Sequence, residues 1–259
     1  MVSPPFWGAP TSYLNFCEED YVITRYVAEF INTLSSFTYM IYGLYGLYHL
    51  HHNQKPNSTP RSIPYFGLIG VGICSAGYHM TLKYHTQMSD ELSMHLLTTP
   101  LLYRILTFQS TPQRKKTTGV VLFTLFTIVM VVHMLMDEFV LHAVSFGSAV
   151  LVITVKTLRI IRVEIKDERV RGKVGRVALF GVGSFIFGYL VWLIDEFACG
   201  MWHVFTAIGG YIAVAIIDLI TSGEVGRDSV GELAWPVAGV GRILGDGVSE
   251  GVEEVEKRK

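Results

Sequence analysis

Seven long apolar stretches limit the folds that this chain can adopt. A helix needs roughly 20 mostly apolar residues to cross the hydrocarbon core of a bilayer. Half of the 259 residues are hydrophobic, which is more than an ordinary soluble domain carries. The stretches cover residues 30–51, 64–82, 89–108, 119–135, 139–160, 177–194 and 201–220. We therefore predict an all-α fold, a polytopic membrane protein with a bundle of seven transmembrane helices.

Basic residues divide the connecting loops into two groups. Lysine and arginine gather in the loops after the first, third and fifth stretches, with seven of them between residues 159 and 176. The positive-inside rule then places the N-terminus in the lumen and the C-terminus in the cytosol. Three parts follow: a lumenal segment 1–28, a membrane domain 29–221 and a flexible cytosolic tail 222–259, rich in Gly, Glu and Val. The formal net charge of −1 gives no argument for a nucleic-acid partner.

One segment, which closes the second stretch and opens the third, carries three chemically active side chains. Ser75 and His79 are four residues apart, so they share one face of a helix. Asp90 opens the next span after a short turn. Because an ionisable residue in or beside a membrane span is costly, it marks a candidate functional site. The alternative is that Ser75 bonds its own backbone and His79 only anchors the helix at the interface.

The predicted topology gathers several polar residues at the lumenal end. Glu29 begins the first span there, and His203 begins the seventh. Together with His79 and Asp90 they would share one end of the bundle. A neutral imidazole is a common metal ligand, and two from different helices can form the nucleus of a zinc site. The remaining intramembrane histidines are expected to be unconnected; they are His95, His133 and His142.

Three stretches resemble the alkaline ceramidases, which are seven-span membrane hydrolases that cleave the amide bond of ceramide. The first comprises residues 6–12, 15–21 and 26–33, beginning with the letters FWGAPTS. The second runs from Ser75 to Leu92 and includes HMTLKY and DEL. The third is WHVFTAIGGY, which begins at Trp202. The resemblance extends over about residues 5–221.

The resemblance implies a role for each matching residue. Ser75 would stabilise the substrate oxyanion and Asp90 would be the general acid and base, while His79 and His203 would bind catalytic Zn²⁺. The N-terminal segment resembles a Ca²⁺ loop whose oxygen ligands would come from Asn15, Phe16 (through its carbonyl), Glu18, Asp20 and Glu29. The family usually has an aspartate in place of Asn15, so the charge of this loop is reduced. Without the resemblance, the acidic residues would be read as a solvated loop.

The family also has a histidine four residues before the one that matches His203, where this chain has Cys199. In one alignment Cys199 replaces that histidine as a zinc ligand, because thiolate binds zinc well. In the other, which we favour, Cys199 matches a family cysteine that pairs with the N-terminal segment. It would then form a disulfide with Cys17, which can persist in the lumen. The loop that carries the first zinc histidine would be absent.

The resemblance thus implies hydrolysis of ceramide to a sphingoid base and a fatty acid, in the endoplasmic reticulum or Golgi. The partner would be a ceramide-type lipid, and no protein partner is implied. Two alternatives are a silent, lipid-binding member that lacks a zinc ligand and a seven-span receptor of the progestin and adiponectin receptor type. The distribution of basic residues disfavours the receptor, which has the opposite orientation.

Overall fold

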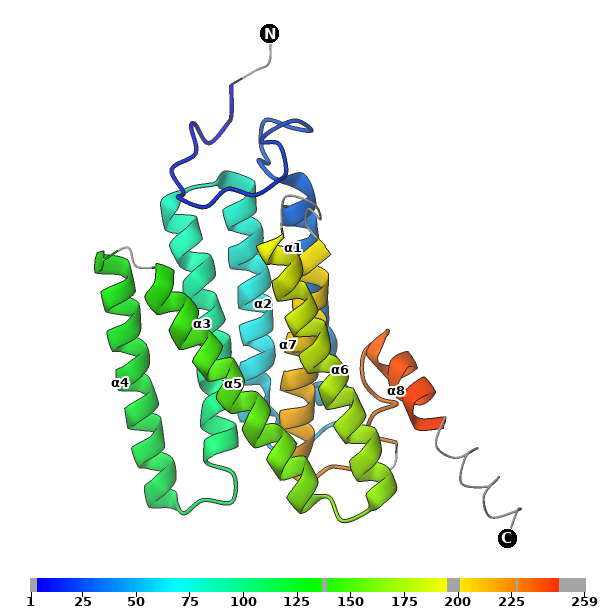
Figure 1. Ribbon diagram of the computed structural model, residues 1–259. Helices are drawn as coiled ribbons and strands as arrows, with labels where there is room; N and C mark the ends of the chain where they lie inside the picture. Colours follow the sequence, from blue (N-terminus) through cyan, green and yellow to red (C-terminus); the bar gives the residue numbers. More distant parts are fainter. Residues whose placement is uncertain (1–3, 137–138, 195–200, 227, 247–259) are drawn as a thin grey trace.

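The structure, a computed structural model, describes residues 4–136, 139–194, 201–226 and 228–246 (Figure 1). Over these residues the regular elements are helices, and the only β-type pairing is an isolated bridge between Thr24 and Val27. The all-α prediction is therefore confirmed. The helices are α1 (Phe30–His52), α2 (Ser58–Thr81), α3 (Tyr84–Leu106), α4 (Pro112–Met136), α5 (Phe139–Glu164), α6 (Glu168–Leu193), α7 (Met201–Ser222) and α8 (Val237–Asp246).

Each of the seven apolar stretches falls on one of the helices α1 to α7. Some helices begin earlier than their apolar stretch, because polar residues can continue a helix beyond the hydrocarbon. The start of α6 shows why. The side chain of Asp167 accepts hydrogen bonds from the backbone N–H groups of Arg169 and Val170 at 2.9 and 3.1 Å. Such an N-cap supplies partners for the first turn, so the helix can start in the charged loop.

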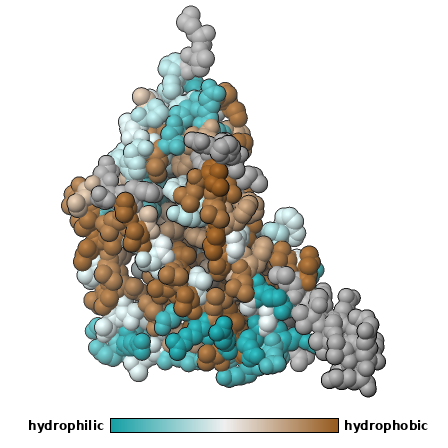
Figure 2. All heavy atoms as spheres, in the orientation of Figure 1, coloured by the Kyte–Doolittle hydropathy of each residue, from teal (hydrophilic) through white to brown (hydrophobic). Residues whose placement is uncertain are grey.

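Four helices are long and apolar enough to cross a membrane: α4, most of α5, α6 and most of α7. They indicate an integral membrane protein. Figure 2 shows a broad apolar belt on the visible face, with polar residues gathered toward its two ends. The helices α1 to α3 are less apolar because polar side chains of theirs are buried inside the bundle, among them Asn32, Gln87 and Glu91. The full count of seven spans stays a prediction.

The bundle is packed most closely around α1, α2, α6 and α7, which supply much of its core. Glycine permits the closest approach: a Cβ atom on Gly209 of α7 would lie 2.8 Å from the carbonyl oxygen of Gly181 on α6. By contrast, α4 lies at the edge of the bundle (Figure 1) and buries only Met130 and His133 among its residues. Its outer surface is apolar, as expected of a helix that faces lipid.

The N-terminal segment crosses one end of the bundle, above the turn between α2 and α3 (Figure 1). The backbone N–H of Thr11 donates to the carbonyl of Leu82 at 2.9 Å, and that of Glu29 donates to the carbonyl of His79 at 2.9 Å. Both bonds tie the segment to the part of α2 that carries the candidate site.

The structure differs from the expected flexible tail over residues 228–246. The segment before α8 buries Val230 and Leu233 in the main core, and α8 begins with the fully buried Val237. The backbone N–H of Ala234 donates to the hydroxyl of Tyr211 on α7 at 2.9 Å. These contacts order a segment of the tail, although the Gly- and Glu-rich composition of residues 222–259 as a whole indicates disorder. Residues 247–259 lie outside the described part of the chain.

Candidate active site

Side chains from α1, α2 and α7 meet beneath the N-terminal segment. Ser75 and His79 of α2 are buried, as is His203 of α7, and Glu29 is fully buried immediately before α1. The rings of His79 and His203 are perpendicular, with centroids 4.8 Å apart. The structure therefore brings together a serine, two histidines and a carboxylate that are scattered along the sequence.

Glu29 and His79 form a closely bonded pair inside this cluster. His79 Nδ1 lies 2.5 Å from Glu29 Oε2, and the amide of Asn32 donates to the same oxygen at 3.1 Å. Because a carboxylate oxygen accepts, Nδ1 carries the hydrogen of this bond, and Nε2 is the nitrogen left for another partner. Within the described part of the chain, His79 Nε2 is buried and has no hydrogen-bond partner. A histidine held in this way by a carboxylate is the usual arrangement of a metal ligand.

His203 lies between two serine hydroxyls. Its Nδ1 lies 2.9 Å from Ser35 Oγ, and its Nε2 lies 3.2 Å from Ser75 Oγ. Ser75 Oγ also lies 3.0 Å from Ser36 Oγ. The side chain of Ser75 is thus hydrogen-bonded to residues of α1 and α7. This disfavours the alternative in which its hydroxyl bonds only to the backbone of its own helix. Its hydroxyl lies beside the histidines, where it can donate to a bound substrate.

Asp90 lies on α3 and is only partly buried. Its carboxylate interacts electrostatically with Tyr39, Cys74 and Tyr78. Cys74 and Tyr78 immediately precede Ser75 and His79, so Asp90 lies near the same end of α2. A hydrogen bond from its side chain to the serine or the histidines is not among the contacts of the described residues. Asp90 therefore lies near the cluster without a direct bond to it among the described residues.

Aromatic rings close the cluster toward the N-terminal segment. The ring of Phe16 lies 5.2 Å from that of His79 and stacks on Trp202 at 6.1 Å. Trp202 in turn stacks on His203 at 3.5 Å. The rings of Phe16 and Trp202 thus pack against the two histidines.

The residues of the expected Ca²⁺ loop lie next to this cluster. Glu18 accepts hydrogen bonds from the backbone N–H groups of Ile31 and Asn32, at 2.7 to 3.0 Å, and so caps α1. The N–H of Phe16 donates to Asn15 Oδ1 at 3.0 Å and to Glu29 Oε1 at 3.3 Å. Glu29 is thus shared between the loop and His79, a contact that the sequence does not reveal.

Asp20 completes a group of three neighbouring carboxylates. Its pKa is raised, first by burial and then by the charges of Glu29 and Glu18. Its Oδ1 is buried and has no hydrogen-bond partner in the part of the chain that is described. Mutually repelling oxygens with an unused acceptor are what a bound cation would stabilise.

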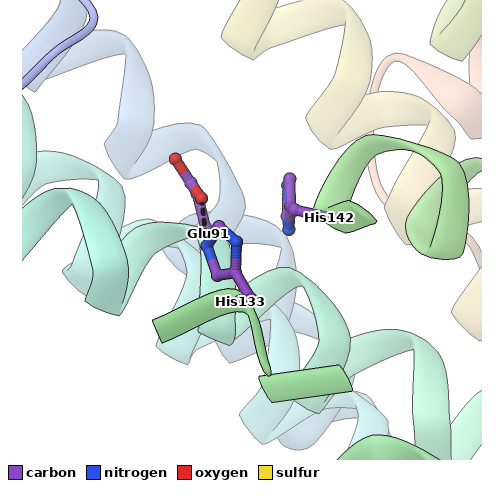
Figure 3. A group of neighbouring side chains, drawn as sticks. All are labelled: Glu91, His133 and His142. Carbon is purple, nitrogen blue, oxygen red and sulfur yellow. Dashed lines mark ion pairs between the residues drawn. The ribbon is translucent and has the colours of Figure 1, made fainter. Parts of the chain in front are cut away.

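A second polar cluster contradicts the expectation of unconnected histidines. His133 of α4 and His142 of α5 face Glu91 of α3 (Figure 3), and one ligand atom from each lies within 4.8 Å of the others. The ring of His95 lies 5.1 Å from that of His142. Sequence reasoning missed this group because the convergence of α3, α4 and α5 is set by packing. The one available signal was that each of these side chains interrupts an apolar stretch.

Cys199 lies outside the described residues. Both of its alternatives, the disulfide with Cys17 and the ligation of zinc, therefore stay predictions.

The comparisons with known proteins agree with the motifs. The family model described as Ceramidase matches residues 8–201. Alkaline ceramidase 3 of Mus musculus is 28% identical over 233 residues, which cover 81% of this chain and 84% of the relative. Alkaline ceramidase YPC1 of Saccharomyces cerevisiae is 27% identical over 249 residues, covering 83% and 78%. With most of its length matched in this way, the chain belongs to the ceramidase family.

Proposed function

We propose that this chain hydrolyses the amide bond of ceramide, releasing a sphingoid base and a fatty acid. Membership of the ceramidase family supports this class of reaction. The observation that carries the proposal is the buried pair of Glu29 and His79 beside His203, in which His79 Nε2 has no hydrogen-bond partner among the described residues. A hydrolase that acts on a lipid amide also agrees with the apolar surface of the bundle.

The residues present fit a zinc ion in part. His79 Nε2 and a ring nitrogen of His203 would be two ligands, and Glu29 would hold the ring of His79 in the required tautomer. A catalytic zinc site usually has three protein ligands and one open position. Cys199 is a candidate for the third, although a disulfide with Cys17 would remove it. We therefore expect zinc to be bound weakly.

Each side chain of the cluster has its own role in the proposed reaction. When bound, zinc supplies Lewis acidity and a water of lowered pKa. Asp90 would take a proton from the attacking water as the C–O bond to the amide carbon forms, and Ser75 would donate a hydrogen bond to the developing oxyanion. Asp90 then returns the proton to the nitrogen as the C–N bond breaks. Glu29 keeps its hydrogen bond to His79 throughout, which fixes the ring.

We further propose that the N-terminal loop binds Ca²⁺ through Asn15, the carbonyl of Phe16, and the carboxylates of Glu18, Asp20 and Glu29. The close approach of the three carboxylates and the raised pKa of Asp20 support this proposal. The seven-span topology, with the N-terminus lumenal in the endoplasmic reticulum or Golgi, belongs to the same proposal and rests on the basic loops.

The function is tested with the purified full-length chain in detergent, by release of fatty acid from ceramide and by zinc content. His79→Ala should abolish turnover and lower zinc content. Asp90→Asn should keep the zinc but lower turnover by about 10²- to 10⁴-fold, the usual contribution of a general acid and base. His85→Ala is the matched control, because His85 is exposed on the same helix as Asp90. Wild-type turnover in His79→Ala would overturn the proposal.

A further inference from the structure

The group formed by Glu91, His133 and His142 is buried near the end of the bundle that the N-terminal segment covers, close to the end of α4 and the start of α5. All three side chains are buried, although they come from three different helices (Figure 3). His133 Nε2 lies 2.6 Å from Glu91 Oε2. One ring nitrogen of His142 lies within 4.8 Å of both ligand atoms. The three side chains therefore direct nitrogen and oxygen atoms toward one point.

The surroundings of Glu91 fix the direction of its carboxylate. Its Oε1 accepts hydrogen bonds from the hydroxyl of Tyr13 and from the amide of Gln87, both at 2.9 Å. The other oxygen is left to face the histidines. Hydrogen bonds that orient a ligand from behind are typical of metal sites and raise their affinity. Tyr13 belongs to the N-terminal segment, so this support comes from outside the bundle.

Packing alone gives little reason for these residues. The helix α4 is otherwise a lipid-facing element, and His133 is one of only two residues that it buries. Ionisable side chains are costly in such a helix. Where they occur, they mark binding sites or pathways for ions and protons more often than simple packing. Two histidines and a glutamate on three separate helices are therefore better explained by a ligand than by chance.

We propose that Glu91, His133 and His142 form a second zinc site, separate from the cluster of His79 and His203. Two imidazoles and one carboxylate are a ligand set that zinc accepts, whereas calcium and magnesium prefer oxygen ligands alone. With ligand bonds of about 2.1 Å, tetrahedral coordination places the ligand atoms about 3.4 Å apart. The contact of 2.6 Å between Glu91 and His133 must then open slightly.

A zinc ion at this point would join α3, α4 and α5. It would hold the peripheral helix α4 to the bundle by bonds that do not depend on apolar packing. Glu91 follows Asp90 directly in α3, so the ion would also fix the turn of helix that carries the candidate acid and base. The inference does not require that the first cluster bind zinc or act on ceramide.

The test counts zinc ions in the purified full-length chain after equilibration with zinc and removal of excess metal. His142→Gln keeps a polar side chain of similar size and should bind one zinc fewer than the wild type. Glu91→Gln tests the same site from another helix and should give the same loss. His52→Ala is the matched control, because His52 is an exposed histidine at the end of α1. Size-exclusion chromatography checks that each variant is folded.

The outcomes separate this site from the proposed function. If His142→Gln and Glu91→Gln retain the wild-type number of zinc ions, the second site does not exist. The same conclusion follows if the wild type holds less than one zinc, or if His79→Ala alone removes all of it. If His142→Gln loses one zinc while His79→Ala loses none, the second site stands and the zinc-dependent reaction fails.

Discussion

At the scale of single residues, the bond from Glu29 decides which ring nitrogen of His79 is left for the proposed metal. Glu29→Gln keeps the size of the side chain but replaces the charged acceptor of the bond to His79 Nδ1. Loss of such an outer partner weakens metal binding by about 10- to 100-fold. Zinc affinity is measured by competition with a chelator of known affinity, with Glu19→Gln as control, since Glu19 is exposed in the same loop. An unchanged affinity would show that Glu29 does not orient a ligand.

Asp20 gives a prediction about pH. Its folded pKa is raised above the ordinary value, so ionisation opposes folding, and this cost appears as pH rises from the ordinary pKa through the folded one. A bound cation offsets the repulsion from Glu18 and Glu29. We expect added Ca²⁺ to raise the unfolding temperature more at pH 7 than at pH 4.

The variant Asp20→Asn tests whether Asp20 contributes to this effect of Ca²⁺, because it removes the charge of the side chain. Without Ca²⁺ it should be at least as stable as the wild type at pH 7, and with Ca²⁺ it should gain less. Thermal unfolding of both proteins at the two pH values measures this. An equal gain from Ca²⁺ in both proteins would exclude Asp20 as a ligand.

The residue types of the first site could be predicted from the sequence, but their partners could not. Ser75, His79 and His203 stand out because polar residues interrupt or end apolar stretches, and the structure brings them together. The bond between Glu29 and His79 joins residues 50 positions apart. It depends on how the N-terminal segment folds back onto α2, and no local pattern records that. For the same reason, no local pattern in the sequence predicts that Glu91, His133 and His142 lie together.

At the scale of elements, α6 and α7 are held at a distance that only glycine allows. A Cβ atom on Gly209 would lie 2.7 Å from Phe185 Cβ and 2.8 Å from the oxygen of Gly181. One on the adjacent Gly210 would lie 3.5 Å from Leu68 Cδ2, an ordinary contact. We expect Gly209→Ala to be less stable than Gly210→Ala by about 1–3 kcal/mol, the usual cost of overpacking.

Thermal unfolding in detergent compares the two variants directly. Since both replace glycine by alanine within α7, the gain in helix propensity is the same and cancels. The difference between them therefore reports the contact with α6. Equal stabilities would mean that the two helices separate easily, and that the close approach is not required.

The helices themselves were largely predictable, because length and hydropathy suffice to find α1 to α7. Their ends were less so, since caps such as Asp167 extend a helix beyond its apolar part. The order of the segment at 228–246 was missed because its glycines, and the acidic residues that follow it, indicate disorder, although its apolar residues are closely spaced. Val230 and Val237 are buried in the same core as residues of helices much earlier in the chain.

At the scale of the whole molecule, two polar groups mark the opposite ends of α2. Near its start, the guanidinium of Arg61 pairs with Asp218 of α7 at 2.8 Å and with Glu224 beyond it at 2.5 Å. Near its end lies His79. At 1.5 Å per residue the 18 residues between Arg61 and His79 span about 27 Å, close to the thickness of a bilayer core of about 30 Å. The bundle is therefore long enough to place these groups at opposite interfaces.

The last prediction concerns which interface is which. The basic loops follow α1, α3 and α5, at the end of the bundle that carries Arg61, and the positive-inside rule assigns this end to the cytosol. In sealed microsomes, an added protease should remove an epitope placed after Lys259 and leave intact one placed before Met1. Microsomes opened with detergent are the control, in which both epitopes should be lost. If sealed microsomes lose the N-terminal epitope and keep the C-terminal one, the orientation is reversed, and the site of His79 faces the cytosol.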